Sequence, residues 1–169
     1  MTIPHRMRAS MGKRNSTLKV AVFTLLIIPT PFAVAQSDNV KILMSVLTAD
    51  LEQLGVPKID NGELHFGKTK VSGDAVDAMM KKQAGVATVL TKTGETYVRA
   101  ATTIKKNDGT SAVGTTLDAS SPAIAKLDEG EAYYGDATIF GKTYDAGYEP
   151  IKDATGAVIG AYFVGVPKK

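Results

Sequence analysis

One arginine lies in a segment whose composition is typical of a β-strand, the run from Tyr97 to Ala101. Because side chains alternate between the two faces of a strand, Tyr97, Arg99 and Ala101 are expected on the same face. A buried guanidinium without a partner is unfavourable, so Arg99 is expected either on a solvated face of a sheet or in contact with an anion. The segment alone is equally consistent with a solvated position and with an anion contact.

Two tyrosines, Tyr144 and Tyr148, occur on a second strand-like segment with Ala146 between them. The spacing of two places all three on one face. Two rings beside a small residue can form an apolar wall whose hydroxyls contact a polar ligand. By themselves, however, they are more typical of ordinary core or surface tyrosines.

Residues for catalysis are scarce. The sequence lacks G-x-S-x-G, G-x-x-x-x-G-K-[ST], G-x-G-x-x-G and H-E-x-x-H, the motifs of several large enzyme classes. It has no cysteine, and His65 is the only histidine after the first 35 residues. His65 precedes Phe66 and Gly67 and is expected to be a partly buried strand or turn residue. The sequence therefore favours neither an enzyme, a metal site nor a cofactor site.

The N-terminal 35 residues have the order of a secretory signal. Five basic residues precede the apolar run 20–28, which is followed by Pro29, Pro31 and the small-residue triplet 33–35. This run of nine residues, of which only Thr24 is polar, is well short of the roughly 20 that span a bilayer. We expect residues 1–35 to be a signal peptide cleaved after Ala35; an uncleaved anchor is the alternative.

The charge distribution argues against nucleic-acid binding. The whole chain of 169 residues has a formal charge of +3, but the first 35 residues hold five of its 20 basic residues and none of its 17 acidic ones. The remaining 15 basic and 17 acidic residues give the rest of the chain a charge of −2. A domain with this balance lacks the basic surface that phosphate backbones require.

The remaining residues predict one α+β domain. Apolar residues recur every three or four positions over 38–54 and again over 74–82, which predicts two helices. Runs rich in β-branched and aromatic residues, separated by short turns, predict five antiparallel strands, and Ser120-Ser121-Pro122 predicts a short helix through Leu127 between the second and third. The expected strands are 86–91, 96–104, 132–140, 143–151 and 157–166.

The order of these motifs resembles the single-Cache (PAS-like) extracytoplasmic sensor domains, of the Cache 3/Cache 2 fusion type, found in bacterial chemoreceptors and sensor kinases. The resemblance covers roughly residues 60–167. It rests on the ordered segments Leu64-His65-Phe66-Gly67, Tyr97-Val98-Arg99-Ala100-Ala101-Thr102, Ala112-Val113-Gly114-Thr115-Thr116-Leu117, Gly141-Lys142-Thr143-Tyr144, Tyr148-Glu149-Pro150-Ile151 and Val158-Ile159-Gly160-Ala161-Tyr162-Phe163.

The resemblance implies a PAS-like five-stranded antiparallel sheet with an N-terminal helix on one face and a ligand pocket under connecting segments on the other. It also implies a small carboxylate ligand, such as acetate, propionate, lactate or pyruvate. The ligand-binding residues that it implies in this sequence are Tyr97, Arg99, Thr102, Lys142, Tyr144 and Tyr148.

We therefore expect residues 36–169 to form a freestanding periplasmic Cache domain, without a stable membrane span, that binds a small organic anion for sensing or for presentation to a membrane sensor or chemoreceptor. The family's receptors continue into a second transmembrane helix, whereas this sequence stops at Lys169, just after the last strand. The alternative is a ligand-independent interaction module that regulates a membrane sensor. The apolar side of the N-terminal helix could pack within one chain or against a second copy, so the sequence is consistent with both a monomer and a homodimer.

Overall fold

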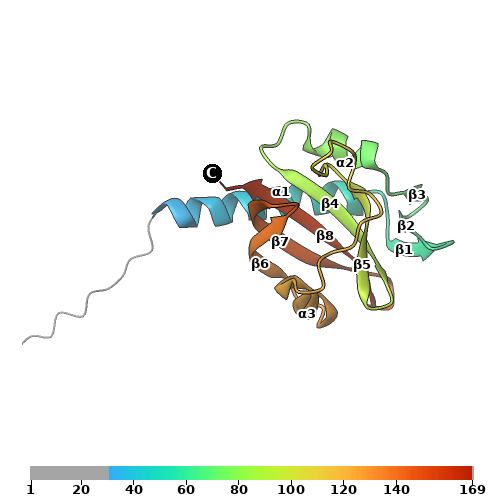
Figure 1. Ribbon diagram of the computed structural model, residues 1–169. Helices are drawn as coiled ribbons and strands as arrows, with labels where there is room; N and C mark the ends of the chain where they lie inside the picture. Colours follow the sequence, from blue (N-terminus) through green and yellow to red (C-terminus); the bar gives the residue numbers. More distant parts are fainter. Residues whose placement is uncertain (1–30, 169) are drawn as a thin grey trace, which may run out of the picture.

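The computed structural model describes residues 31–168 and has the predicted α+β fold. A long helix packs on one face of a five-stranded antiparallel sheet, and a short helix packs on the other face (Figure 1). The elements in chain order are α1 (Pro31–Glu52), β1 (Pro57–Asp60), β2 (Glu63–Phe66), β3 (Thr69–Lys70), α2 (Gly73–Met80), β4 (Val86–Thr93), β5 (Thr96–Thr102), α3 (Pro122–Asp128), β6 (Tyr133–Ile139), β7 (Lys142–Lys152) and β8 (Val158–Pro167).

The large sheet has the strand order β5-β4-β8-β7-β6, and all its neighbouring strands are antiparallel. Three tight turns connect its sequential neighbours, as the short links in the sequence predict. β5 and β6, which residues 103–132 connect in the sequence, form the opposite edges of the sheet. The five predicted strands are confirmed, with ends that differ by a few residues.

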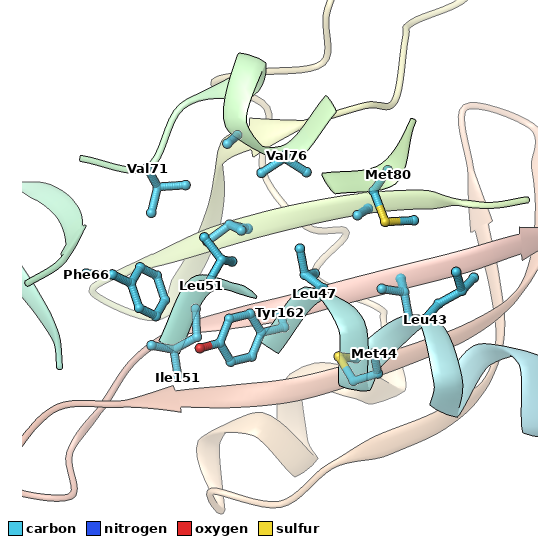
Figure 2. Close-up of a cluster of buried hydrophobic side chains, with 14 of the residues drawn as sticks. Leu43, Met44, Leu47, Leu51, Phe66, Val71, Val76, Met80, Ile151 and Tyr162 are labelled. Atoms are coloured by element: carbon cyan, nitrogen blue, oxygen red, sulfur yellow. The ribbon is translucent and has the colours of Figure 1, made fainter. Parts of the chain in front are cut away.

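Helix α1 provides most of the core on the first face of the sheet. Its side chains Val40, Leu43, Met44, Leu47 and Leu51 are buried, at the spacing of three and four that predicts a helix. They pack against residues from both sheets and from α2, and Figure 2 shows Leu47 beside Tyr162 of β8. This face of the large sheet is therefore filled by the protein's own side chains.

The predicted helix starts at residue 38, whereas α1 begins at Pro31. The expected cleavage point after Ala35 falls inside this helix, whereas residues 1–30 of the expected signal peptide lie outside the described residues. The helix ends at Glu52, close to the predicted residue 54, and Gly55 follows with a φ of +126° that favours glycine. Within residues 31–168, no helix is long and apolar enough to span a bilayer.

A second, smaller sheet of three strands, β1-β2-β3, was not predicted. Its strands have four, four and two residues, and only β2 alternates between exposed and buried positions. His65 lies on β2 and is partly buried, as expected. Helix α2 follows this sheet and confirms the predicted short helix, with Ser72 as its N-cap residue.

The second face of the large sheet carries its own core. The segment 103–132 crosses this face, and its apolar residues Ile104, Ala112, Leu117, Ala123 and Leu127 are buried against the strands. Helix α3 begins at Pro122 with Ser121 as its N-cap, close to the predicted bounds. The predicted arrangement, with connecting segments over the second face, is confirmed.

Candidate functional site

A β-bulge in β5 determines which of its residues face the second core. Leu90 of β4 pairs with Arg99, but the preceding Val89 pairs with Ala101, so Ala100 has no partner. An extra residue in one strand reverses the alternation beyond it. Arg99 therefore lies on the face of Leu90, whereas Ala101 is buried in the core beneath α1. The expectation that Ala101 shares a face with Arg99 is wrong because strict alternation ignores the bulge.

Arg99 is a buried cation held by the segment that crosses the sheet. Only 5% of the surface of this residue is exposed. Nη1 donates to the Thr115 hydroxyl at 3.0 Å and to the Thr116 carbonyl at 2.6 Å. The Arg99 backbone also bonds to this segment, since its N–H donates to the Thr115 carbonyl and its carbonyl accepts from Gly114. These bonds fix the orientation of the guanidinium.

The remaining donors of Arg99 have no partner among residues 31–168. Within residues 31–168 it forms no ion pair, and neither Nε nor Nη2 donates to a protein acceptor. Among these residues no fully buried side-chain nitrogen or oxygen lacks a hydrogen bond. Because Nε and Nη2 have no such bond, they are not fully buried, and Arg99 lines a cavity.

This cavity has a volume of about 500 Å³. It lies beneath the segment that crosses the second face of the sheet, between Arg99 of β5 and the hairpin of β6 and β7. The lining residues are Arg99, Thr116, Leu117, Asp118, Ser120, Ser121, Pro122, residues 136–140 and Tyr148. A concave site of this size with one buried cation can enclose a small anion.

Burial disfavours the charged form of Arg99 and lowers its pKa. A guanidinium nevertheless stays protonated at physiological pH. The positive charge thus lies in a partly desolvated position, and no carboxylate of the described part of the chain neutralises it. An anion bound at its free donors would relieve this unfavourable situation and would form charge-assisted hydrogen bonds.

Tyr148 provides a second polar group in the cavity. Its ring is fully buried and packs on Phe163, with the ring centroids 4.7 Å apart. Burial raises the pKa of Tyr148, so its hydroxyl remains a donor, although Arg99 opposes the shift. This hydroxyl has no bond to the described residues and is not among the fully buried atoms, and Tyr148 lines the cavity.

The two carboxylates around the cavity already have partners. Asp118 Oδ1 accepts from the backbone N–H of Ser120 at 2.9 Å and from its hydroxyl at 2.7 Å. Asp136 lies at an exposed position of β6 and forms an ion pair with Lys168. Neither carboxylate forms an ion pair with Arg99. No group of three or more His, Cys, Asp or Glu residues in the described part of the chain is arranged to hold a metal ion.

Three of the other candidate residues lie on the same sheet face as Arg99, and one lies away from the cavity at an exposed position. Tyr97, Thr102 and Tyr144 lie on the same face as Arg99 but do not line the cavity. Tyr144, Ala146 and Tyr148 share one face, as predicted. Lys142 is exposed at the start of β7 and does not line the cavity.

Phe140 contributes to the cavity and was not identified from the sequence. Its ring lies beside the guanidinium, with Arg99 Cζ 5.9 Å from the ring centroid. The sequence predicts Phe140 as the last residue of the strand 132–140, whereas in the structure it forms the two-residue turn with Gly141, where Asn or Asp is usual. The available signal was an aromatic residue directly before a glycine.

A second cavity has a similar volume, about 530 Å³, but a different character. It is lined by residues around the end of α1 and the junction of β7 and β8. Its charged residues, Glu52 and Lys152, are exposed and have opposite signs. Since it lacks a buried unpaired charge, we consider the Arg99 cavity the stronger candidate.

Comparison with known proteins identifies the family of this fold. Residues 33–169 match the family model described as the Cache 3/Cache 2 fusion domain. No curated protein matches the chain significantly. The resemblance of the sequence motifs is thereby confirmed at the level of the family.

Proposed function

Because the chain belongs to the Cache 3/Cache 2 fusion domain family, we propose that it is a periplasmic sensor domain for a small organic anion. Cache domains are extracytoplasmic domains that bind small ligands and are not catalysts. The proposed ligand is a short-chain carboxylate, of the class of acetate, propionate, lactate or pyruvate. The bound domain presents its ligand state to a membrane sensor or chemoreceptor.

A single observation supports the anion most strongly, namely the unpaired donors of Arg99 at the cavity. Nη1 is occupied by Thr115 and Thr116, which leaves the edge formed by Nε and Nη2 for the ligand. Two parallel N–H donors match the two oxygens of a carboxylate. The Tyr148 hydroxyl supplies a further donor from β7.

The other proposed site residues act at different distances from the ligand. Tyr97, Thr102 and Tyr144 support the sheet face beneath the cavity, whereas Lys142 attracts anions from its exposed position.

A ligand of four to six heavy atoms gains at most about 1.5 kcal/mol per atom, so dissociation constants of roughly micromolar or weaker are expected.

The test is calorimetric titration of the purified protein with a panel of short carboxylates, together with Arg99→Ala and Arg99→Lys. At least one acid should bind to the unsubstituted protein. Arg99→Ala should abolish binding, and Arg99→Lys should weaken it at least tenfold, because an ammonium cannot replace the two-donor edge. Lys58→Ala, which removes an exposed cation on the small sheet, is the matched control.

Circular dichroism spectra of the variants establish that the fold is retained. If no acid binds, or if Arg99→Ala binds as tightly as the unsubstituted protein, the proposal is wrong.

A further inference from the structure

Phe140 occupies a backbone conformation that its side chain disfavours. Ile139 and Lys142 pair at the ends of β6 and β7, so Phe140 and Gly141 form a two-residue turn, and their φ angles are +49° and +78°. Positive φ at both positions defines a type I′ turn, in which Asn-Gly is the preferred pair. A bulky residue at the first position is strained.

The same chain contains this turn with the preferred sequence. Asn61 and Gly62 connect β1 and β2 with φ angles of +52° and +79°, nearly identical to those of Phe140 and Gly141. The fold therefore needs only the turn, which Asn-Gly provides without strain. The aromatic ring at Phe140 requires an explanation other than the hairpin.

What distinguishes Phe140 from Asn61 is its place at the cavity. Its ring lies over the Arg99 guanidinium, and it lines the same cavity as Tyr148 and Leu117. Residues in disfavoured backbone conformations persist where surrounding interactions or a ligand compensate. The strained turn thus places an apolar surface next to the proposed carboxylate contact.

The size and lining of the cavity indicate what this apolar surface contacts. A volume of about 500 Å³ is within the range of sites for ligands much larger than acetate. Apolar side chains form much of its wall, among them Leu117, Pro122, Ile139 and Phe140. A two-carbon acid bound to Arg99 would leave this wall in contact with water, which is unfavourable.

We propose that Phe140 is a ligand-selecting residue and that the site prefers a monocarboxylate with an apolar body of about the size of a phenyl ring. This inference rests on the proposed function, since it assigns the carboxylate to Arg99. The apolar body lies along the wall of the cavity and against the Phe140 ring. Aromatic contact and loss of apolar surface to water together favour such a ligand over acetate.

The experiment compares phenylacetate, acetate and the uncharged phenylacetamide by calorimetric titration of the purified protein. Phenylacetate should bind at least tenfold more tightly than acetate, and phenylacetamide should bind at least tenfold more weakly than phenylacetate. Phe140→Asn recreates the Asn-Gly turn of the small sheet. It should raise the melting temperature by a few degrees and should reduce phenylacetate affinity about tenfold while changing acetate affinity less than twofold.

Asn61→Phe is the reciprocal control. It places the strained residue in the turn between β1 and β2 and should lower the melting temperature without affecting phenylacetate binding. Phe140→Gly, which also tolerates positive φ, provides a second variant that lacks the ring.

The outcomes separate the two proposals. Equal or tighter binding of acetate would overturn the preference for an apolar body and leave the carboxylate function intact. A Phe140→Asn protein that retains the preference for phenylacetate would overturn the role of Phe140. If neither acid binds to the unsubstituted protein but the more polar lactate or pyruvate does, the preference for an apolar body is wrong, and if no carboxylate binds, both proposals are wrong.

Discussion

The hydroxyl of Tyr97 donates a hydrogen bond of 2.9 Å to Oδ1 of Asp128 and thereby ties the last residue of α3 to β5. Lys92 Nζ donates to the same oxygen at 2.6 Å. Tyr97 is fully buried, so its hydroxyl would have no comparable partner if α3 moved away. This contact fixes one end of the segment that covers the cavity.

Asp128→Asn should reduce the free energy of unfolding by about 1 kcal/mol at pH 7, because the ion pair and the charged acceptor for Tyr97 are lost. The expected loss in free energy of unfolding is small because 42% of the Asp128 side chain is exposed and water screens its ion pair with Lys92. Urea denaturation measures the difference, and Glu129→Gln, which alters the neighbouring exposed carboxylate, is the control.

The same substitution should alter the response to acid. The hydrogen bond from Lys92 lowers the pKa of Asp128, with a further contribution from Tyr97 and opposition from burial. A lowered pKa in the folded state gives stability that is present above the unfolded pKa of about 3.9 and is lost as the pH falls below it. The difference between the two proteins should therefore shrink between pH 5 and pH 3. A constant difference over this range would contradict this assignment.

Tyr148→Phe should weaken binding of the proposed carboxylate about threefold to tenfold while leaving stability within about 0.5 kcal/mol. The substitution removes only a hydroxyl that has no partner within residues 31–168, and it keeps the ring that packs on Phe163. Titration calorimetry and urea denaturation measure the two quantities. Tyr133→Phe, on the neighbouring strand and outside the cavity lining, is the control, and equal affinities of both variants would argue against a Tyr148 contact.

Thr102→Val should destabilise the protein by about 2 kcal/mol, because it removes a buried acceptor and donor. The hydroxyls of Thr88 and Thr102 are 2.6 Å apart, and Thr102 also accepts from the Ile104 N–H at 3.1 Å. The double variant with Thr88→Val should be less destabilised than the sum of the two single variants, since no hydroxyl is then left without its partner. Additive effects in thermal unfolding would show that the hydroxyls are not coupled.

Leu47→Ala should lower the free energy of unfolding by about 2 to 5 kcal/mol, the range for a buried leucine that leaves a cavity. Leu47 lies in the middle of the apolar side of α1 and is completely buried. Ile42→Ala, on the same helix but at a position 58% exposed, should change stability by less than about 1 kcal/mol. Chemical denaturation compares them, and similar losses would contradict the packing of α1 described above.

Expression in a bacterial host with an export system should yield a protein that begins at Gln36, in the periplasmic fraction. The prediction follows from the basic, apolar and small-residue order of residues 1–35. Intact mass spectrometry locates the cleavage site. An Ala33→Leu/Ala35→Leu variant should remain uncleaved, because signal peptidases require small residues there. Recovery of the full chain from the cytoplasm would contradict the prediction.

Most of the large sheet could be predicted because its signals are local. Glycines in two-residue turns and runs of β-branched residues determine the hairpins, whatever the rest of the chain does. The small sheet contains the Asn61-Gly62 turn, but its strands carry little signal, since β1 presents Lys58, Ile59 and Asp60 all exposed and β3 has only two residues. Its formation depends on pairing and on packing against α1, which are properties of the assembled fold.

The candidate site was predictable only in part. Arg99 was recognisable because an arginine in mid-strand requires a partner, but its hydrogen bonds to Thr115 and Thr116 depend on how the chain returns across the sheet. The bulge at Ala100 depends on pairing with β4, so alternation gave Ala101 the wrong face. Phe140 lines the cavity because the turn between β6 and β7 lies opposite β5 across it, although both strands are distant from β5 in the strand order.

The two edges of the large sheet, β5 and β6, both contribute to the same cavity, although three strands separate them in the hydrogen-bonding order. A molecule held between Arg99 and the end of β6 therefore bridges the first and the last strand. Any change in the width of this gap must be absorbed by the intervening strands, and α1 packs against the opposite face of the same sheet. How closely the cavity encloses its ligand on one face of the sheet is thus mechanically linked to the position of α1 on the other face.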